Sequence, residues 1–166
     1  MDADFLGSNL AADALARGDK VAVCDDLSKV DATVKLHWLR SQGALEFRHG
    51  DIRNRTDIEQ AIASVEPEAI MHLAGQVTMT KSLENPRLDF EVNALGSLNL
   101  LEAVRQFAPK AQVLFSSTNK VYDDLEQLTY TESDTRYICV EKPEGFGEET
   151  PLAFEGPYGC SKGSGD

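Results

Sequence analysis

The sequence predicts an α/β fold in which a doubly wound, mostly parallel sheet is covered by helices on both faces. Short apolar runs alternate with longer stretches of helical periodicity, and glycine, proline or aspartate residues mark the junctions. Strands that are separated by helices form right-handed βαβ units, so consecutive strands lie parallel. The 166 residues and the 42% hydrophobic content fit one domain with a proper core.

The first third of the chain supplies two helices and two strands. Apolar residues recur with helical spacing from Leu6, and Gly18 stands where that helix would end. The strand VAVC follows and ends at Asp25 and Asp26, while ALEF forms the next strand. Between these strands a helix is expected within DATVKLHWLRSQG. Its buried side is expected to consist of Val34, Leu36, His37, Trp38 and Leu39.

The middle of the chain repeats this alternation. Thr56 is expected to cap a helix that runs through Val65, and Pro67 separates this helix from the buried strand AIMHLAG. A long helix, RLDFEVNALGSLNLLEAVRQFA, then extends from Pro86 to Pro109 and leads into the strand VLFSS. These elements complete the alternation that predicts the parallel sheet.

Residues 123–156 interrupt the alternation. Ten acidic residues stand here against two basic ones, and five glycine or proline residues punctuate the stretch. Such a composition lacks the apolar periodicity that a second core would need. We therefore expect a surface excursion over about 123–156, and not a second domain.

Composition narrows the class of partner. A net charge of −12 argues against nucleic acid, because phosphate binding needs a basic surface. The sequence has no apolar run that predicts a membrane segment or a signal peptide, so a cytoplasmic protein is expected. The three cysteines lack the spacing of metal ligands, which makes a metal site or disulfide framework unexpected. His37 and His72 are assigned to packing.

Four predicted strands end in small or polar residues. The ends are Asp25-Asp26, Gly50-Asp51, Leu73-Ala74-Gly75 and Ser116-Ser117-Thr118. The carboxyl ends of parallel strands meet at one edge of the sheet, where ligands bind in folds of this class. The sequence therefore predicts a binding site along this edge.

Near the end of the sequence, PYGCSKG places Tyr158 four residues before Lys162. In a helix this spacing brings both side chains to one face, close enough for the ammonium to act on the phenol. A tyrosine has a pKa of about 10, so it needs such a cation to serve as a base at neutral pH. The pair is therefore a candidate acid-base site.

Seven segments occur along the chain in the order of a known superfamily. They are FLGSNL, DDLS, GDIR, HLAG, NALGSLNLLEA, SSTNKVY and YGCSK. Through them the chain resembles the extended short-chain dehydrogenase/reductase superfamily of nucleotide-sugar epimerases and dehydratases, which have a Rossmann-like fold. The segments HLAGQV, SSTNKVY, DLEQ, TRYICVEKP and FEGPYGCSKG are most similar to those of 2-epimerases that act on CDP-3,6-dideoxyhexoses.

The resemblance implies an incomplete NAD-binding Rossmann domain over residues 1–166. The first strand and the C-terminal substrate domain of the family are missing from the sequence, so we expect a truncated form of the fold. NAD is the implied cofactor, and a nucleotide sugar, with a CDP-3,6-dideoxyhexose expected, is the implied substrate. The full-length form is implied to be a cytoplasmic homo-oligomer in lipopolysaccharide O-antigen biosynthesis.

The resemblance also implies roles for single residues. The implied catalytic residues are Thr118, Tyr158 and Lys162. The implied substrate-binding residues are Thr118, Asn119 and Lys120. The implied cofactor-binding residues are Phe5, Leu6, Gly7, Asp25, Asp26, Ser28, Asp51, Ile52, Leu73, Ala74, Gly75, Gln76, Asn93, Ser116, Tyr158 and Lys162. Asp25 would hold the ribose hydroxyls and repel a 2′-phosphate, which favours NAD over NADP.

The implied reaction is inversion at C2 of the sugar through a transient 2-keto sugar. Asn119 and Lys120 stand where dehydratases of the superfamily have an Asp-Glu pair, so an epimerase is preferred. Another nucleotide-sugar epimerase, a 4,6-dehydratase and a non-catalytic Rossmann-like fragment remain as alternatives. Met1 and Asp4 occupy two of the three glycine positions of the family's phosphate-binding turn, and Asp123 replaces a further glycine.

Overall fold

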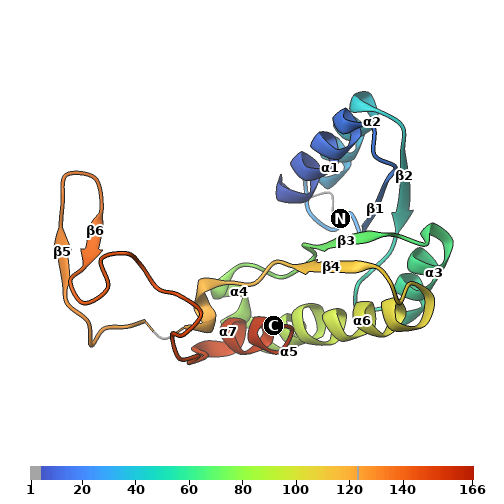
Figure 1. Ribbon diagram of the computed structural model, residues 1–166. Helices are drawn as coiled ribbons and strands as arrows, with labels where there is room; N and C mark the ends of the chain where they lie inside the picture. The colour runs from blue at the N-terminus through green and yellow to red at the C-terminus, as the bar shows by residue number, and fades with distance from the viewer. Residues whose placement is uncertain (1–4, 123) are drawn as a thin grey trace.

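The computed structural model describes residues 5–122 and 124–166 and confirms an α/β fold with parallel strands (Figure 1). In chain order the elements are α1 (Phe5–Arg17), β1 (Val21–Asp25), α2 (Ala32–Gln42), β2 (Leu45–His49), α3 (Arg55–Val65), β3 (Ala69–His72), α4 (Met79–Glu84), α5 (Pro86–Phe90), the π-helical segment η1 (Glu91–Leu95), α6 (Gly96–Phe107), β4 (Gln112–Phe115), the 3-10 turn η2 (Asn119–Val121), β5 (Tyr130–Glu132), β6 (Tyr137–Cys139) and α7 (Gly156–Gly163). Within the described ranges, no helix is long and apolar enough to cross a membrane.

The four parallel strands form two pairs. Strand β1 runs beside β2, with Val21 opposite Leu45, and β3 runs beside β4, with Ala69 opposite Gln112. Among the described residues no ladder joins β1 to β3, so the two pairs are separate two-stranded sheets. The sequence predicts a mostly parallel sheet without its central first strand, and two separate pairs fit that expectation.

Helices α1 and α2 pack against each other beside the β1–β2 pair (Figure 1). Small residues on α1 allow this close approach, since the buried positions of this helix are Gly7, Ser8, Ala11 and Ala14. The helix ends one residue before Gly18, whose φ of 87° is the left-handed value that glycine adopts without strain. The shared core consists of Ala11, Ala14, Val21, Val23 and Leu39.

The buried side of α2 is narrower than the sequence analysis predicts. Its buried residues are Ala32, Leu36 and Leu39, which the helical repeat brings to one face. The prediction is wrong for the other three residues: Val34 is 69% exposed, Trp38 is 42% exposed and His37 is exposed. These side chains lie on the faces of the helix that point away from α1 and β1.

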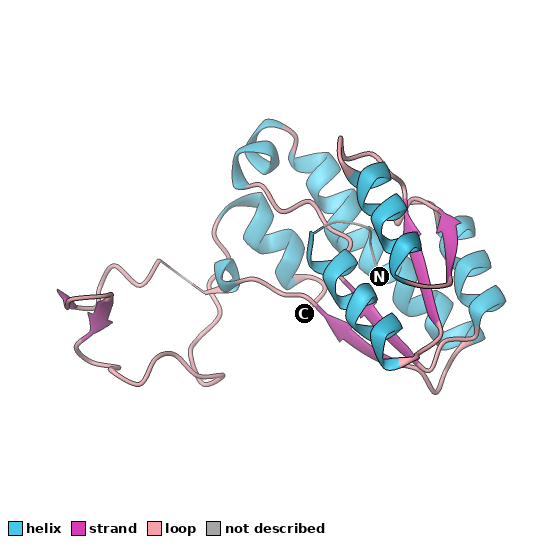
Figure 2. Ribbon diagram, turned by 90° about the horizontal axis from the view of Figure 1, so that it is seen from above, coloured by secondary structure: helices cyan, strands magenta, loops and turns pink. Residues whose placement is uncertain are grey.

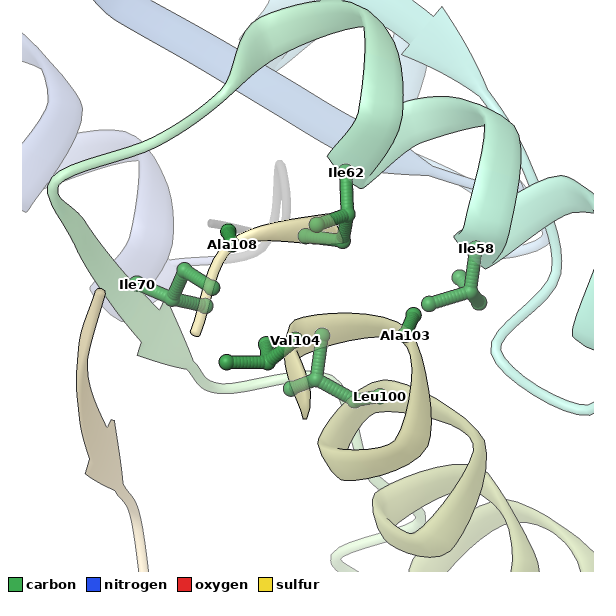
Figure 3. Close-up of a cluster of buried hydrophobic side chains, with 7 residues drawn as sticks. All are labelled: Ile58, Ile62, Ile70, Leu100, Ala103, Val104 and Ala108. Atoms are coloured by element: carbon green, nitrogen blue, oxygen red, sulfur yellow. The ribbon is translucent and has the colours of Figure 1, made fainter. Parts of the chain in front are cut away.

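A second core joins α3, β3 and α6. Its seven buried residues are shown in Figure 3 and are Ile58, Ile62, Ile70, Leu100, Ala103, Val104 and Ala108. Burying one large aliphatic side chain contributes about 1.5–3 kcal/mol, so this cluster supplies much of the stability of the β3–β4 half. It also holds α6 against α3 and thereby fixes the helix that carries the polar residues of the site.

Two local features of the helices correct the sequence analysis. Asn54, and not Thr56, caps α3: the Asn54 side chain accepts a hydrogen bond from the Thr56 backbone N–H at 3.0 Å. Asparagine is at least as good a cap as threonine, and it stands at the true start of the helix. The long helix after Pro86 is present, but its residues Glu91–Leu95 form a π-helical turn. Such turns are frequent at functional sites.

Residues 124–155 leave this framework as an arm that projects away from it (Figure 2). The arm holds the antiparallel hairpin β5–β6, in which Tyr130 pairs with Cys139. The hairpin was not expected, because its three-residue strands are too short to show a clear alternation of apolar and polar residues. The arm rejoins the framework at an antiparallel bridge between Tyr122 and Leu152.

Candidate functional site

A cavity of about 770 Å³ opens at the carboxyl ends of β1, β2 and β3. Ligand pockets commonly measure about 300–1,000 Å³, so the cavity is large enough for a cofactor-sized molecule. Nine of the residues predicted to bind the cofactor line it, namely Asp25, Asp26, Ser28, Asp51, Ile52, Leu73, Ala74, Gly75 and Gln76. Its apolar walls include Ile58, Ile70 and Leu100. The structure thus brings three of the four predicted strand ends together at this cavity, while Ser116, Ser117 and Thr118 after β4 do not line it.

Two aspartates shape the turn after β1. Asp25 Oδ1 accepts a hydrogen bond from the backbone N–H of Leu27 at 2.7 Å, and Asp26 Oδ1 accepts one from that of Ser28 at 3.0 Å. Leu27 adopts a left-handed φ of 53° in this turn. Both carboxylates line the cavity, so this end of it is acidic and disfavours an additional phosphate.

The turn after β2 is fixed by side chains. Arg53 Nε lies 3.0 Å from both carboxylate oxygens of Asp51, and these hydrogen bonds are the main reason that the pKa of Asp51 is lowered. Asn99 on α6 donates to the carbonyl oxygen of Ile52 at 3.0 Å. The Ile52 side chain lies over Gly96, where a Cβ would come within 2.8 Å of it. Asp51 and Ile52 are therefore held at the cavity wall from two sides.

The segment after β3 meets both the π-helical turn and α7 at Gly75. A Cβ on Gly75 would lie 3.1 Å from Asn93 Oδ1 and 3.9 Å from Lys162 Nζ, so only glycine leaves this surface open. Asn93 Oδ1 accepts a hydrogen bond from the backbone N–H of Gln76 at 2.9 Å, and Asn93 Nδ2 donates to the Gln76 carbonyl oxygen at 3.0 Å. The buried Asn93 side chain thus fixes the backbone of this wall.

Helix α7 carries the predicted acid-base pair. Tyr158 is 8% exposed and Lys162 is 5% exposed, and their four-residue spacing places them on one face of the helix. Lys162 Nζ donates to the carbonyl oxygen of Ser116 and stands 4.3 Å from the centroid of the Phe115 ring. The lysine therefore links α7 to the end of β4, and it also reaches the Gly75 wall.

Lys162 is buried near acidic residues, and its charge also affects the pKa of His72. Burial lowers the pKa of Lys162, and the negative charges of Asp166 and Asp89 oppose that shift. Burial, followed by the charge of Lys162, lowers the pKa of His72 to about 4. His72 is therefore neutral at pH 7, and its Nε2 lies 2.9 Å from Ser97 Oγ. This buried position confirms the assignment of His72 to packing.

The turn after β4 holds the three residues predicted to meet the substrate. Thr118 caps η2, and its Oγ1 accepts a hydrogen bond from the backbone N–H of Lys120 at 3.2 Å. Lys120 Nζ forms an ion pair with Asp124 at 3.2 Å, and Asn119 is exposed. Helix α7 packs against this turn, so Thr118 belongs to the same end of the molecule as the Tyr158–Lys162 face.

We expect Gly159→Ala to destabilise the packing of α7 against η2. A Cβ at this position would come within 2.5 Å of the backbone carbonyl oxygen of Lys120, which cannot move like the end of a side chain. Overpacking of this kind costs about 1–3 kcal/mol, measured as the free energy of unfolding in urea. The control is Gly43→Ala, whose Cβ would meet only the Leu15 side chain at 3.4 Å. Equal stability of the two variants would contradict the tight contact.

Some predicted residues lie away from the cavity. Phe5 and Leu6, at the start of α1, are 74% and 51% exposed, Gly7 is buried, and none of the three lines the cavity. The other predicted cofactor residues that do not line it are Asn93, Ser116, Tyr158 and Lys162. Their cofactor role stays a prediction. The described residues contain no group of three or more His, Cys, Asp or Glu residues that could hold a metal ion. The expectations for Met1, Asp4 and Asp123 concern positions outside the described residues.

Sequence reasoning missed a buried polar network beside Asn93. Asp89 and Ser161 are fully buried, and Ser97 is 2% exposed. A signal was present, because Asp89, Asn93 and Ser97 recur every four residues on one face of a long helix that is otherwise apolar there. Polar residues at core positions need hydrogen-bond partners, so this spacing predicts a network.

Comparisons with known proteins agree with this geometry. The family model described as GDP-mannose 4,6 dehydratase matches residues 3–166. The chain is 56% identical over 162 residues to the CDP-paratose 2-epimerase of Salmonella typhi, a match that covers 98% of this chain and 48% of that protein. It is 35% identical to the bifunctional UDP-glucose 4-epimerase and UDP-xylose 4-epimerase 3 of Arabidopsis thaliana, covering 96% of this chain and 42% of that protein.

Solved structures share the fold. The UDP-glucose 4-epimerase of Thermus thermophilus in complex with NAD matches with a TM-score of 0.73 and 32% identity, over 98% of this chain and 47% of that one. The dTDP-glucose 4,6-dehydratase DesIV of Streptomyces venezuelae, with NAD and TYD bound, matches with a TM-score of 0.76 and 25% identity, over 99% and 49%. The chain spans about half the length of the curated relatives it matches. It belongs to the GDP-mannose 4,6 dehydratase family of extended short-chain dehydrogenases/reductases.

Proposed function

We propose that the full-length protein is an NAD-dependent epimerase that inverts C2 of a CDP-3,6-dideoxyhexose and converts CDP-paratose to CDP-tyvelose. One observation of the structure carries the proposal: α7 directs Lys162 toward the glycine wall of the cavity, with Tyr158 one turn earlier on the same face. The 56% identity to a CDP-paratose 2-epimerase supports the choice of sugar and of nucleotide.

The residues around the cavity fit NAD. Asp25 stands at the end of β1, where it can accept hydrogen bonds from ribose hydroxyls. The backbone from Leu73 to Gly75 offers a surface without a protruding side chain, since a Cβ on Gly75 would fill the space before Asn93 and Lys162. NAD, when bound, supplies an acceptor for a hydride from the sugar carbon and returns that hydride within the same cycle.

The chain's own residues would handle the proton. Tyr158 removes the proton of the C2 hydroxyl when that carbon is oxidised and returns it when the alcohol of opposite configuration forms. The positive charge of Lys162, one helical turn later on the same face, would support Tyr158 in this role. Thr118 would hold the same hydroxyl, so that the proton leaves the hydroxyl oxygen and the hydride leaves C2 in one geometry.

A 4,6-dehydratase fits the turn after β4 less well. Elimination of water needs an acid and a base in addition to the tyrosine. At the two positions after Thr118 the chain has the exposed amide of Asn119 and the Lys120 ammonium, which is paired with Asp124. Neither group can replace a pair of carboxyl groups, so inversion without elimination is the better match.

The test is a substrate comparison with the purified full-length protein. Conversion of CDP-paratose would be followed by NMR, beside UDP-glucose and dTDP-glucose as substrates for 4-epimerisation and 4,6-dehydration, and bound NAD would be measured in the same samples. We expect C2 inversion of the CDP sugar alone. Activity only on UDP-glucose or dTDP-glucose would assign a different reaction, and no activity together with no bound NAD would favour a non-catalytic protein.

We expect Asp25→Ala to reduce the preference of the full-length protein for NAD over NADP. Loss of hydrogen bonds to a charged group costs about 1.5–3 kcal/mol, which is on the order of a 10- to 100-fold weaker affinity for NAD. NADP binding should change little, since the variant also loses the repulsion of the 2′-phosphate. Titration with both cofactors measures the effect, and Asp134→Ala on the exposed arm is the control. Equal binding of NAD and NADP by the unmutated protein would refute the role of Asp25.

A further inference from the structure

Asp89 is a fully buried carboxylate to which the proposed reaction assigns no task. It lies on α5, one turn before Asn93, and is 0% exposed. Its Oδ1 accepts a hydrogen bond from Gln76 Nε2 at 2.9 Å and lies 3.5 Å from Asn93 Nδ2, while its Oδ2 accepts one from Ser161 Oγ. These neighbours come from three places in the fold: Gln76 from the segment after β3, Asn93 from the π-helical turn and Ser161 from α7.

Ser161, which immediately precedes Lys162 in α7, links that helix to the Asp89 carboxylate by a hydrogen bond. The Ser161 hydroxyl donates to Asp89 and accepts a hydrogen bond from Asn93 Nδ2 at 3.0 Å. The hydroxyl has one proton, and the Tyr158 backbone carbonyl oxygen at 3.1 Å competes with Asp89 for it; the charged carboxylate is the stronger acceptor. Ser161 is fully buried, so these two bonds join α7 to α5 and η1 out of contact with water, in addition to the packing of α7 against α4, α5 and η2.

Helix α7 has little local support of its own. It is eight residues long, and its N-cap residue Glu155 makes no side-chain capping hydrogen bond. Isolated helices of this length are unstable in water, so tertiary contacts must hold it. Burying a charged carboxylate costs free energy unless several donors satisfy it, and such an arrangement specifies one geometry.

We propose that Asp89 is a positioning residue of the acid-base site: through Ser161 it fixes α7, and thus Tyr158 and Lys162, against Asn93 and the wall at Gln76. This inference rests on the proposed function. Asp89 acts on the reaction through these neighbours and touches neither substrate nor cofactor.

The charge of Asp89 gives the proposal a measurable signature. Asp89 and Asp166 are the carboxylates whose charges raise the pKa of the buried Lys162, and His72 is the nearby imidazole that the lysine affects. The other titratable groups on α7 and on the elements packed against it do not contribute to the pKa shift of Lys162. They are Tyr158 and Cys160 on α7, Lys81 and Glu84 on α4, Arg87 on α5, Glu91 on η1 and Lys120 on η2. Removing the charge of Asp89 therefore makes Lys162 lose its proton at lower pH.

The experiment compares three variants of the full-length protein. Asp89→Asn keeps the size of the side chain but replaces one carboxylate oxygen by an NH2 group. This group donates hydrogen bonds, whereas Gln76 and Ser161 donate to the native carboxylate. Ser161→Ala keeps the charge and removes the connection. Glu102→Gln removes a half-exposed carboxylate of α6, which pairs with Arg105 away from α7, and is the control. For each variant, kcat and KM for the CDP sugar are measured across pH, and the Lys162 side chain is titrated by NMR.

Asp89→Asn is expected to lower kcat by about 10- to 100-fold, as small misplacements of catalytic groups do, with KM changed far less. The pH at which activity is lost on the alkaline side, and the midpoint of the NMR titration of Lys162, should both fall by roughly 0.5 pH unit or more. Ser161→Ala should lower kcat without moving the titration, and Glu102→Gln should change neither. A titration that does not move in Asp89→Asn, or an unchanged kcat in Ser161→Ala, overturns the proposal.

Two measurements distinguish a failure of the proposed C2 inversion from a failure of the role assigned to Asp89. If the unmutated protein does not invert C2, the proposed function fails, and the NMR titration of Lys162 alone decides the role of Asp89. If Asp89→Asn does not fold, Ser161→Ala decides, because a hydroxyl-to-hydrogen change leaves the helix and its volume nearly intact.

Discussion

Tyr158→Phe in the full-length protein is expected to lower the rate of C2 inversion by about 10²- to 10⁴-fold, the usual cost of removing a general base. The ring stays in place, so the buried face of α7 and its contact with η2 are preserved. Bound NAD should remain at the level of the unmutated protein, because the cofactor contacts proposed for Asp25 and for the wall at Gly75 are untouched.

The measurement is C2 inversion of CDP-paratose followed together with the content of bound NAD. Tyr137→Phe is the matched control, since this tyrosine is 71% exposed on the projecting arm and loses the same hydroxyl. A Tyr158→Phe protein that inverts C2 at the rate of the control would show that another group takes the proton. The four-residue spacing to Lys162 would then have no catalytic meaning.

Lys162→Met is expected to cause a loss of rate at least as large, again about 10²- to 10⁴-fold, and to lower the content of bound NAD as well. Methionine is unbranched and of similar length, so it fills the site beside Phe115 without the charge. The variant loses the cation that supports the Tyr158 phenolate, the hydrogen bond to the Ser116 carbonyl and the ammonium at the Gly75 wall.

Comparison of the two variants tests this double role. Activity and NAD content would be measured on the same preparations, with Lys110→Met, an exposed lysine, as the control. Tyr158→Phe should keep NAD and Lys162→Met should lose it. If Lys162→Met retained NAD as fully as Tyr158→Phe, the lysine would serve the proton transfer alone.

The alternation of strands and helices could be predicted from the sequence because burial on the sheet imposes a strong periodic pattern. The strands around Val23 and Ile70 are continuous apolar runs, which is typical of parallel strands. In the structure the more buried positions alternate along β1 and β3. The edge that carries Asp25, Asp51 and Gly75 followed from parallel order alone, because the carboxyl ends of such strands meet.

What could not be predicted depends on contacts between distant segments. The exposure of Trp38 is decided by which neighbour α2 meets, and a helical pattern with apolar residues on several faces does not identify that neighbour. The hydrogen bond between Asp89 and Ser161 joins residues 72 positions apart in the chain, so local secondary-structure propensity does not predict it. The π-helical turn around Asn93 has the same origin, because its cost is local and its benefit comes from the Gln76 backbone that Asn93 binds.

The length of that π-helical turn determines which face of α6 points toward α3. Each residue of an α-helix advances the chain by about 100° around the axis, so removing one residue from Glu91–Leu95 would rotate α6 by about that angle relative to α5. Leu100 and Val104 would then turn away from α3, even with Asp89 still facing α7. Apart from Asn93, whose side chain binds the Gln76 backbone, the number of residues in this turn is therefore under stricter constraint than their identity, and substitutions at the other positions are better tolerated than insertions or deletions.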